Sequence, residues 1–191
     1  MPFQEVTIRR ATVEDLPALL EMQRCSVDRL VRRDYTREQI DAFLAYVGTL
    51  DPQVVEDRTY FLAESGDRIA VCGGWSFRVP FLERQEAPNG KASPPSKSEG
   101  GTAYIRSVFV HPDWTRRGLA SRIMRHIEAE VAARAFTRIE LTATLTGVPL
   151  YRKLGYGRED WICLRMPNDV LVPSVVMSKD LDLDQDGQKV A

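Results

Sequence analysis

The residues best suited to chemistry lie where a hydrophobic run meets a helical pattern, in the segment SVFVHPDWTRRGLAS at residues 107–121. The first N–H groups of a helix have no partners within the helix and carry partial positive charge, so a helix start binds phosphate well. Arg116 and Arg117 add positive charge at this point. Gly118 and the small Ala120 leave room for a phosphate to approach the backbone. The sequence therefore predicts a turn that binds pyrophosphate.

This turn does not match the two best-known phosphate-binding motifs. A P-loop ends in lysine followed by serine or threonine, and a dinucleotide fingerprint reads G-x-G-x-x-G. Residues 115–120 read T-R-R-G-L-A and contain neither pattern. A helix start with surface arginines is common, so these six residues alone do not identify a ligand.

Two longer segments resemble the GCN5-related N-acetyltransferase (GNAT) family. VFVHPDWTRRGLAS resembles the family's acetyl-coenzyme A motif, Q/R-x-x-G-x-G/A after a V-x-P strand end, although Thr115 replaces the usual Gln or Arg. GVPLYRKLGYGRE at residues 147–159 resembles the family's F-Y-x-x-L-G-F segment, in which Tyr151 takes the place of a tyrosine near the coenzyme sulfur. The resemblance covers most of residues 6–181, but neither 80–101 nor the C-terminal tail.

The resemblance implies that acetyl-coenzyme A (acetyl-CoA) is the co-substrate and that no metal takes part. Backbone groups of Val108 and Val110 are expected to bond the pantetheine arm, and the N–H of Phe109 or Val110 to polarise the thioester carbonyl. The N–H groups of residues 116–121 are expected to hold the pyrophosphate. The implied cofactor-binding residues are Val108, Phe109, Val110, Thr115, Arg116, Arg117, Gly118, Leu119, Ala120, Ser121 and Tyr151.

Tyr151 is also the candidate catalytic residue, as the general acid that returns a proton to the leaving thiolate. A packing role with the hydroxyl in solvent remains open. The incoming amine must lose a proton, and family members often use a glutamate on the strand that here reads AYIRSVFV, which has no carboxylate. The candidates for this base are Glu64, Glu83, Glu140 and a chain of water molecules.

Three further side chains are candidates for contact with the acceptor. Arg106 either faces the acceptor, where it would suit a substrate with a carboxylate, or lies on the outer face of the sheet. Trp75 and Tyr35 are candidates for lining the acceptor pocket, although aromatic residues at such positions are also typical of a core.

Hydrophobic spacing predicts the elements that must position these residues. Capping boxes, Thr12 with Asp15 and Thr36 with Gln39, start the first two helices. Strands and helices mix without strict alternation, which favours an α/β (α+β mixed) fold with a mostly antiparallel mixed sheet of about seven strands flanked by about four helices. The family resemblance implies that the sheet splays between strands 4 and 5. The predicted strands are 5–10, 58–64, 68–78, 103–110, 137–144, 158–165 and 170–178. The helices after the first one are predicted at 37–47, 117–135 and 147–154.

The chain is expected to form a single domain over residues 1–181. The Pro- and Gly-rich stretch 79–101 is predicted to be a flexible insertion, either without function or as a lid, and 182–191 a disordered acidic tail. The pair Gly73 and Gly74 inside a predicted strand indicates a bulge or a close approach by other groups.

Composition narrows the possible partners. The 191 residues carry a formal net charge of -1, which argues against a nucleic-acid binder. No apolar run is long enough to cross a bilayer and the N-terminus has no signal-peptide pattern, so no membrane association and a cytoplasmic location are expected. The three cysteines show no metal-binding spacing and are expected to be free thiols. A homodimer is expected from the family resemblance.

Together these patterns predict an N-acetyltransferase that moves the acetyl group of acetyl-CoA to a primary amine of a small molecule by direct attack. Two other functions stay open at this stage. One is a sensor module that binds acyl-CoA without catalysis, which the missing strand carboxylate would explain. The other is an N-acetyltransferase that acts on peptides or proteins.

Overall fold

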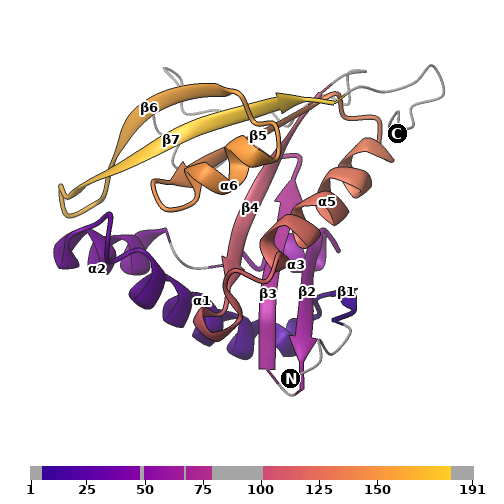
Figure 1. Ribbon diagram of the computed structural model, residues 1–191, viewed down its shortest axis with the longest axis horizontal. Coiled ribbons are helices and arrows are strands. Elements are labelled where there is room, and N and C mark those ends of the chain that lie inside the picture. The colour runs from indigo at the N-terminus through magenta and orange to yellow at the C-terminus, as the bar shows by residue number, and fades with distance from the viewer. Residues whose placement is uncertain (1–5, 48–49, 67, 79–100, 182–191) are drawn as a thin grey trace.

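The computed structural model describes residues 6–47, 50–66, 68–78 and 101–181. Seven strands form one sheet in the order β1-β2-β3-β4-β5-β7-β6 (Figure 1). The pair β4–β5 is parallel and the other neighbouring pairs are antiparallel, which confirms the predicted mixed, mostly antiparallel sheet. The strands are β1 Ile8–Arg10, β2 Tyr60–Ser65, β3 Arg68–Ser76, β4 Thr102–Val110, β5 Arg138–Thr144, β6 Arg158–Arg165 and β7 Leu171–Asp180.

Helices cover both faces of this sheet. In the second predicted capping box, Gln39 N donates to Thr36 Oγ1 at 3.3 Å, and Thr36 N donates to Gln39 Oε1 at 3.0 Å. The one-turn helix α3 was not predicted, because four residues are too few to show a helical period. The α-helices in the described residues are α1 Leu16–Leu30, α2 Arg37–Tyr46, α3 Gln53–Glu56, α5 Leu119–Ala132 and α6 Val148–Lys153, with 3-10 turns η1 Val13–Asp15 and η2 Pro112–Trp114.

Alternation along the strands divides the core between the two faces. Phe61 and Ala63 of β2 join the cluster under α5 and α6, whereas Tyr60 and Leu62 join the cluster under α1 and α3. A side chain on β2, β3 or β4 therefore belongs to one helix layer or the other according to its place in the strand.

The sheet opens between its two parallel strands. Residues 102–104 of β4 pair with residues 138–140 of β5, and no pair between the two strands follows. Beyond that point β5 stays paired with β7 as far as Thr144, and β4 stays paired with β3 as far as Val110. The two halves of the sheet diverge here, as the ribbon shows (Figure 1), and the predicted splay between strands 4 and 5 is confirmed.

A bulge lies in β4 on its β3 side. Cys72 pairs with Phe109 and Gly74 with Arg106, so Gly73 alone faces two residues of β4, Ser107 and Val108. Both glycines are needed for close contact, as the sequence predicted. A Cβ on Gly73 would lie 2.9 Å from Val108 Cγ2, and a Cβ on Gly74 would lie 2.5 Å from the Thr59 carbonyl oxygen and from the Tyr60 ring.

The predicted insertion at 79–101, apart from Gly101, and the predicted tail at 182–191 lie outside the described residues. Among the described residues, no helix is long and apolar enough to cross a membrane. All three cysteines are free, with Cys72 buried, Cys25 half-buried and Cys163 exposed.

We expect Gly74→Ala to lower the free energy of unfolding by about 2 kcal/mol, because the new methyl group would overlap backbone that cannot move aside. Urea unfolding would measure this loss of stability, and the dependence of the free energy of unfolding on urea concentration should stay unchanged. Gly157→Ala is the control, since a Cβ there has no atom within 4 Å, and its effect should stay below about 1 kcal/mol. Equal stability of the two variants would contradict the predicted crowding.

Candidate active site

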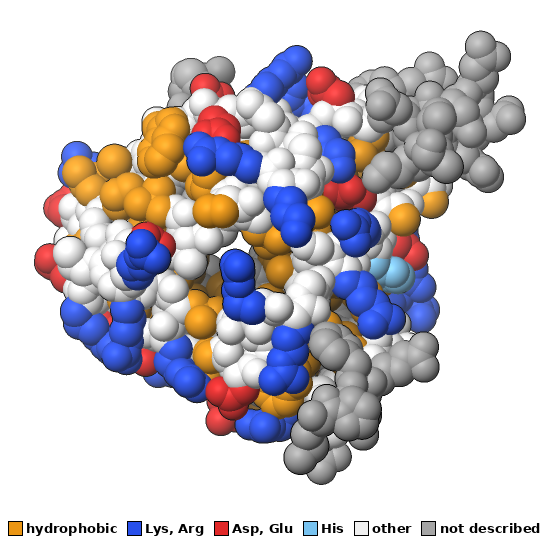
Figure 2. Space-filling model, in the orientation of Figure 1, with side chains coloured by type: hydrophobic (Ala, Val, Ile, Leu, Met, Phe, Trp, Pro, Cys, Tyr) orange, Lys and Arg blue, Asp and Glu red, His pale blue; other side chains and the backbone are white. Residues whose placement is uncertain are grey.

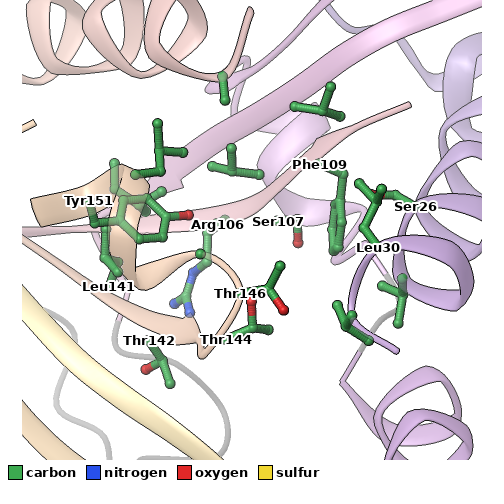
Figure 3. A pocket seen from close by; sticks show the side chains of 18 of the residues that line it. Ser26, Leu30, Arg106, Ser107, Phe109, Leu141, Thr142, Thr144, Thr146 and Tyr151 are labelled. Atoms are coloured by element: carbon green, nitrogen blue, oxygen red, sulfur yellow. The ribbon is translucent and has the colours of Figure 1, made fainter. Parts of the chain in front are cut away.

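A cavity of about 1000 Å³ occupies the opening between β4 and β5. Its walls come from α1, α2, β4, β5, the start of α5 and α6. Figure 2 shows the hollow near the centre of this face with Lys and Arg side chains around it, and Figure 3 shows Ser107 of β4 between Tyr151 on one side and Ser26 on the other. The sheet opening and the surrounding helices therefore form one continuous space.

The turn that the sequence predicts to bind phosphate forms one end of this cavity. The first helical hydrogen bond of α5 runs from Arg122 N to Gly118 O at 3.0 Å, so the N–H groups of residues 119–121 have no acceptor within the helix. The helix begins at Leu119, one to two residues later than predicted. Gly118 has a φ of 77° and an added Cβ would meet no atom within 4 Å. Glycine is thus required there by the left-handed backbone, and the space in front of it is open.

The exposed edge of β4 forms the floor of the cavity. Residues 107–110 line it, and no strand pairs with this part of β4 on its β5 side. An unpaired strand edge offers N–H and C=O groups to an extended ligand, as a neighbouring strand would. A flexible amide-containing chain such as pantetheine has matching groups, so the predicted contacts at Val108 and Val110 fit this edge.

Tyr151 stands opposite that edge. Its side chain is only 8% exposed, and its hydroxyl points into the cavity toward Ser107 and Thr146 (Figure 3). Burial raises the pKa of Tyr151 to about 12, so the phenol stays protonated at neutral pH. The structure thus places the Tyr151 hydroxyl inside the cavity, and its role as a general acid stays a prediction.

Packing against β7 and α5 fixes the short helix that carries Tyr151. The Tyr151 ring contacts the Tyr156 ring edge to face, with centroids 5.8 Å apart. Lys179 Nζ donates to the Leu154 carbonyl at 2.8 Å and to the buried Glu128 carboxylate at 2.9 Å. These contacts hold the middle of the segment that the second family motif covers, from Tyr151 to Tyr156.

Arg106 lies in the cavity and not on the outer face of the sheet. Figure 3 shows its guanidinium group between Tyr151 and the threonines of β5. Its Nη2 donates to the Arg78 carbonyl at 2.6 Å, which holds the group in place. The cationic side chain can therefore meet a ligand in this space.

Two predicted acceptor contacts need correction, and one predicted cofactor residue lies outside the cavity lining. Trp75 pairs with Ile105, so it points to the face opposite Arg106, where it is 1% exposed and packs against Phe136. The Tyr35 hydroxyl is used within the fold, since it donates to the Pro173 carbonyl and accepts from Leu145 N, both at 2.8 Å. Neither lines the cavity in the described part of the chain. Arg117 is exposed and does not line it either; the other predicted cofactor contacts all do.

Neither of the two candidate carboxylate bases among the described residues lines the cavity. Glu64 pairs with Arg9 at 2.9 Å and Glu140 lies 3.7 Å from Arg138, and neither lines it among the described residues. Glu83 lies outside the described residues. The exposed Asp51 is the one described lining residue with a carboxylate, and its Oδ1 accepts from Gln53 N at 3.0 Å.

The sequence prediction missed the wall opposite Tyr151. It is mostly apolar and comes from α1, α2 and the segment after them. Val27 and Leu30 fall at helical spacing in the sequence, but this spacing does not show which surface that side of the helix faces. The apolar wall residues are Val27, Leu30, Val31, Phe43, Tyr46, Val47 and Leu50.

A mixed sheet that opens over a helix start, with a buried tyrosine facing the opening, defines an acyltransferase. Residues 20–156 match the family model described as Acetyltransferase (GNAT) family. The chain belongs to this family, as the two sequence motifs implied.

Solved structures share the fold at low sequence identity. A GCN5-related N-acetyltransferase from Rhodopseudomonas palustris has a TM-score of 0.68 and 16% identity, with 95% of this chain and 99% of that chain covered. The PaiA N-acetyltransferase from Thermoplasma acidophilum, solved in complex with coenzyme A, has a TM-score of 0.58 and 12% identity over 93% and 99% of the two chains. A ribosomal-protein-alanine N-acetyltransferase from Escherichia coli has a TM-score of 0.58 and 14% identity over 97% and 100%.

One curated relative matches over a short stretch. The human cysteine-rich protein 2-binding protein is 32% identical over 60 residues, which are 31% of this chain and 8% of that protein. The match thus spans a small part of the relative's length.

The Tyr151 phenol should ionise only near pH 12, because its burial disfavours the charged phenolate. Tyrosinate absorbance is measured against pH for the wild type and for Tyr151→Phe, and the difference between them should stay near zero up to about pH 11. In the urea-unfolded chain the same difference should appear near about pH 10, the ordinary tyrosine value. A difference that already appears near this value in the folded protein would contradict burial of the hydroxyl.

Proposed function

We propose that this protein transfers the acetyl group of acetyl-CoA to a primary amine of a small molecule by direct attack of the amine. One observation carries the proposal: the helix start at Gly118, the open edge of β4 and the Tyr151 hydroxyl all line the same cavity. These three features match the diphosphate, the pantetheine arm and the sulfur of one extended ligand. Membership of the GNAT family supports acetyl as the group transferred.

The charges of the cavity suit the same ligand. Arg116 lies in the turn before α5, and Lys153 ends α6; both line the cavity. With the N–H groups of residues 119–121 they surround the diphosphate of coenzyme A in our proposal. Acetyl-CoA supplies the acetyl group when it is bound.

In the transfer, the amine nitrogen bonds to the acetyl carbon and the carbon–sulfur bond breaks. The amine loses one proton and the departing thiolate gains one. An N–H group of β4, at Phe109 or Val110, stabilises the negative charge that develops on the acetyl oxygen. Tyr151 donates its proton or a hydrogen bond to the sulfur, and its raised pKa keeps that proton in place at neutral pH.

The apolar wall explains how an amine can become reactive although none of the described residues places a buried carboxylate in the cavity. An ammonium group that leaves water for a wall of Val27, Leu30 and Phe43 loses solvation, and its pKa falls. A larger fraction of the amine is then neutral at neutral pH, and solvent water takes the proton. We propose an acceptor with an apolar body that fits this wall and an anionic group that meets Arg106.

The proposal is tested with acetyl-CoA and a panel of primary amines that differ in apolar body and in the presence of a carboxylate, with release of free coenzyme A thiol as the readout. We expect turnover, highest for apolar amines with a carboxylate, and a fall in kcat of about 100-fold in Tyr151→Phe. The affinity of that variant for acetyl-CoA should stay within about twofold.

Two outcomes of this experiment would contradict the proposal. Tight binding of acetyl-CoA with no turnover on any amine or peptide would favour a sensor module. Turnover on peptide N-termini or lysines, with none on small amines, would favour a protein N-acetyltransferase.

A separate prediction concerns the helix start. Gly118→Ala should weaken coenzyme A binding about tenfold, because a residue with a Cβ disfavours a φ of 77° and the turn must shift its N–H groups. Gly66→Ala is the matched control, since its φ is 63° and an added Cβ also meets open space, but it lies in the β2–β3 turn. Both variants should lose about 1 kcal/mol of stability. Calorimetry with coenzyme A should separate them, and equal affinities would contradict the assigned phosphate site.

A further inference from the structure

We infer that Tyr60, held by Gln23, is a positioning residue for acetyl transfer, because its hydroxyl fixes the peptide group that joins Ser107 to Val108 at the floor of the cavity. The inference rests on the proposed function. It assigns a role to two buried polar side chains that the reaction itself does not touch.

The geometry of this contact is closely defined. The Tyr60 hydroxyl donates to the Ser107 carbonyl at 2.6 Å and accepts from Gln23 Nε2 at 3.2 Å. Cys72 Sγ lies 3.2 Å from the same hydroxyl. Tyr60 and Gln23 are both 0% exposed. Burial raises the pKa of Tyr60, so its hydroxyl keeps the proton that it donates.

The Ser107 carbonyl needs this donor because of the bulge. Ser107 has a φ of 47°, in the left-handed region that a residue with a Cβ enters at a cost of about 1 kcal/mol or more. The bulge also disrupts the β3–β4 ladder at this point. Where the pairing is irregular, the Tyr60 hydroxyl of β2 supplies a donor to this part-buried carbonyl.

The planar Ser107–Val108 peptide group transmits the effect of the Tyr60 hydrogen bond to the cavity. In a trans peptide, the C=O of one residue and the N–H of the next point in opposite directions. When Tyr60 holds the Ser107 oxygen, it therefore also fixes the direction of the Val108 N–H. Ser107, Val108 and Phe109 all line the cavity, so this hydrogen bond fixes one peptide group of the floor, next to the Phe109 N–H that is proposed to meet the thioester.

Two neighbours make the contact possible. The Tyr60 ring crosses over Gly74, where any side chain would overlap it. Gln23 lies on the same face of α1 as Ser26, Val27 and Leu30, which are three, four and seven residues further on and line the acceptor side of the cavity. The helix that forms the acceptor wall is thus tied to the floor of the site through Gln23 and Tyr60.

Tyr60→Phe removes the hydroxyl and keeps the ring. With the best acceptor from the amine panel, kcat should fall about tenfold or more, while Kd for acetyl-CoA stays within about twofold. The infrared band of bound acetyl-CoA, isotope-labelled at the thioester carbonyl, should move from its position in the wild-type complex toward its position in free solution. That band reports polarisation of the carbonyl, which a purely structural loss would not change.

Thr59→Val is the matched control. It removes a buried hydroxyl one residue away that bonds only the Val54 carbonyl in the described structure, and that carbonyl keeps its bond from Thr59 N. Its kcat and carbonyl band should equal those of the wild type. Gln23→Met removes the donor to Tyr60 at similar volume and should shift kcat and the band in the same direction by less, which keeps the test decisive if Tyr60→Phe does not fold.

Failure of the positioning role can be told apart from failure of the proposed function. A wild type that transfers acetyl groups, with Tyr60→Phe and Gln23→Met that keep both its kcat and its carbonyl band, would overturn the positioning role alone. A wild type that binds no acetyl-CoA, or transfers to no amine, would refute the proposed function and this inference together.

Discussion

The site depends on the point at which β4 and β5 stop pairing. Three residues of each strand are paired, and then β5 bonds only β7 while β4 bonds only β3. Buried backbone groups require partners, so a strand edge left open inside a protein is stable only if water or a ligand reaches it. The cavity gives that access, and the open edge becomes the surface on which an extended amide-containing ligand can lie.

The bulge in β4 accounts for the divergence. An extra residue bends its strand and increases the local twist, which directs β4 away from β5 just beyond their last pair, at Tyr104. Gly73 and Gly74 give the bulge room on both faces of β3, and the Tyr60 hydroxyl donates to the Ser107 carbonyl within the bulge. The same local distortion therefore opens the sheet and shapes the floor of the site.

The features of the site that depend on neighbouring residues in the chain could be predicted from the sequence. The helix start near Gly118, the Thr36 capping box and the close approach at the glycine pair each depend on residues a few positions apart. Tyr35 was placed wrongly because its partners, Leu145 and Pro173, are 110 and 138 residues away. Trp75 was placed wrongly because strand alternation gives two faces but does not say which one the cavity occupies. That choice is made by helix packing, which no short segment encodes.

The two ends of the cavity also divide its electrostatics. Fixed positive charge and helix N–H groups gather at the end formed by the turn before α5, where a ligand with a diphosphate would bring negative charge. The end formed by α1 and α2 is mostly apolar, and the one carboxylate that the described residues place there, on Asp51, is exposed. An apolar environment disfavours an ammonium ion and lowers its pKa, so the amine can lose its proton without a nearby base. A site of this kind can therefore favour the neutral amine by removing solvation from its ammonium form, which releases its proton to solvent. The absence of a carboxylate on β4 is thus consistent with catalysis.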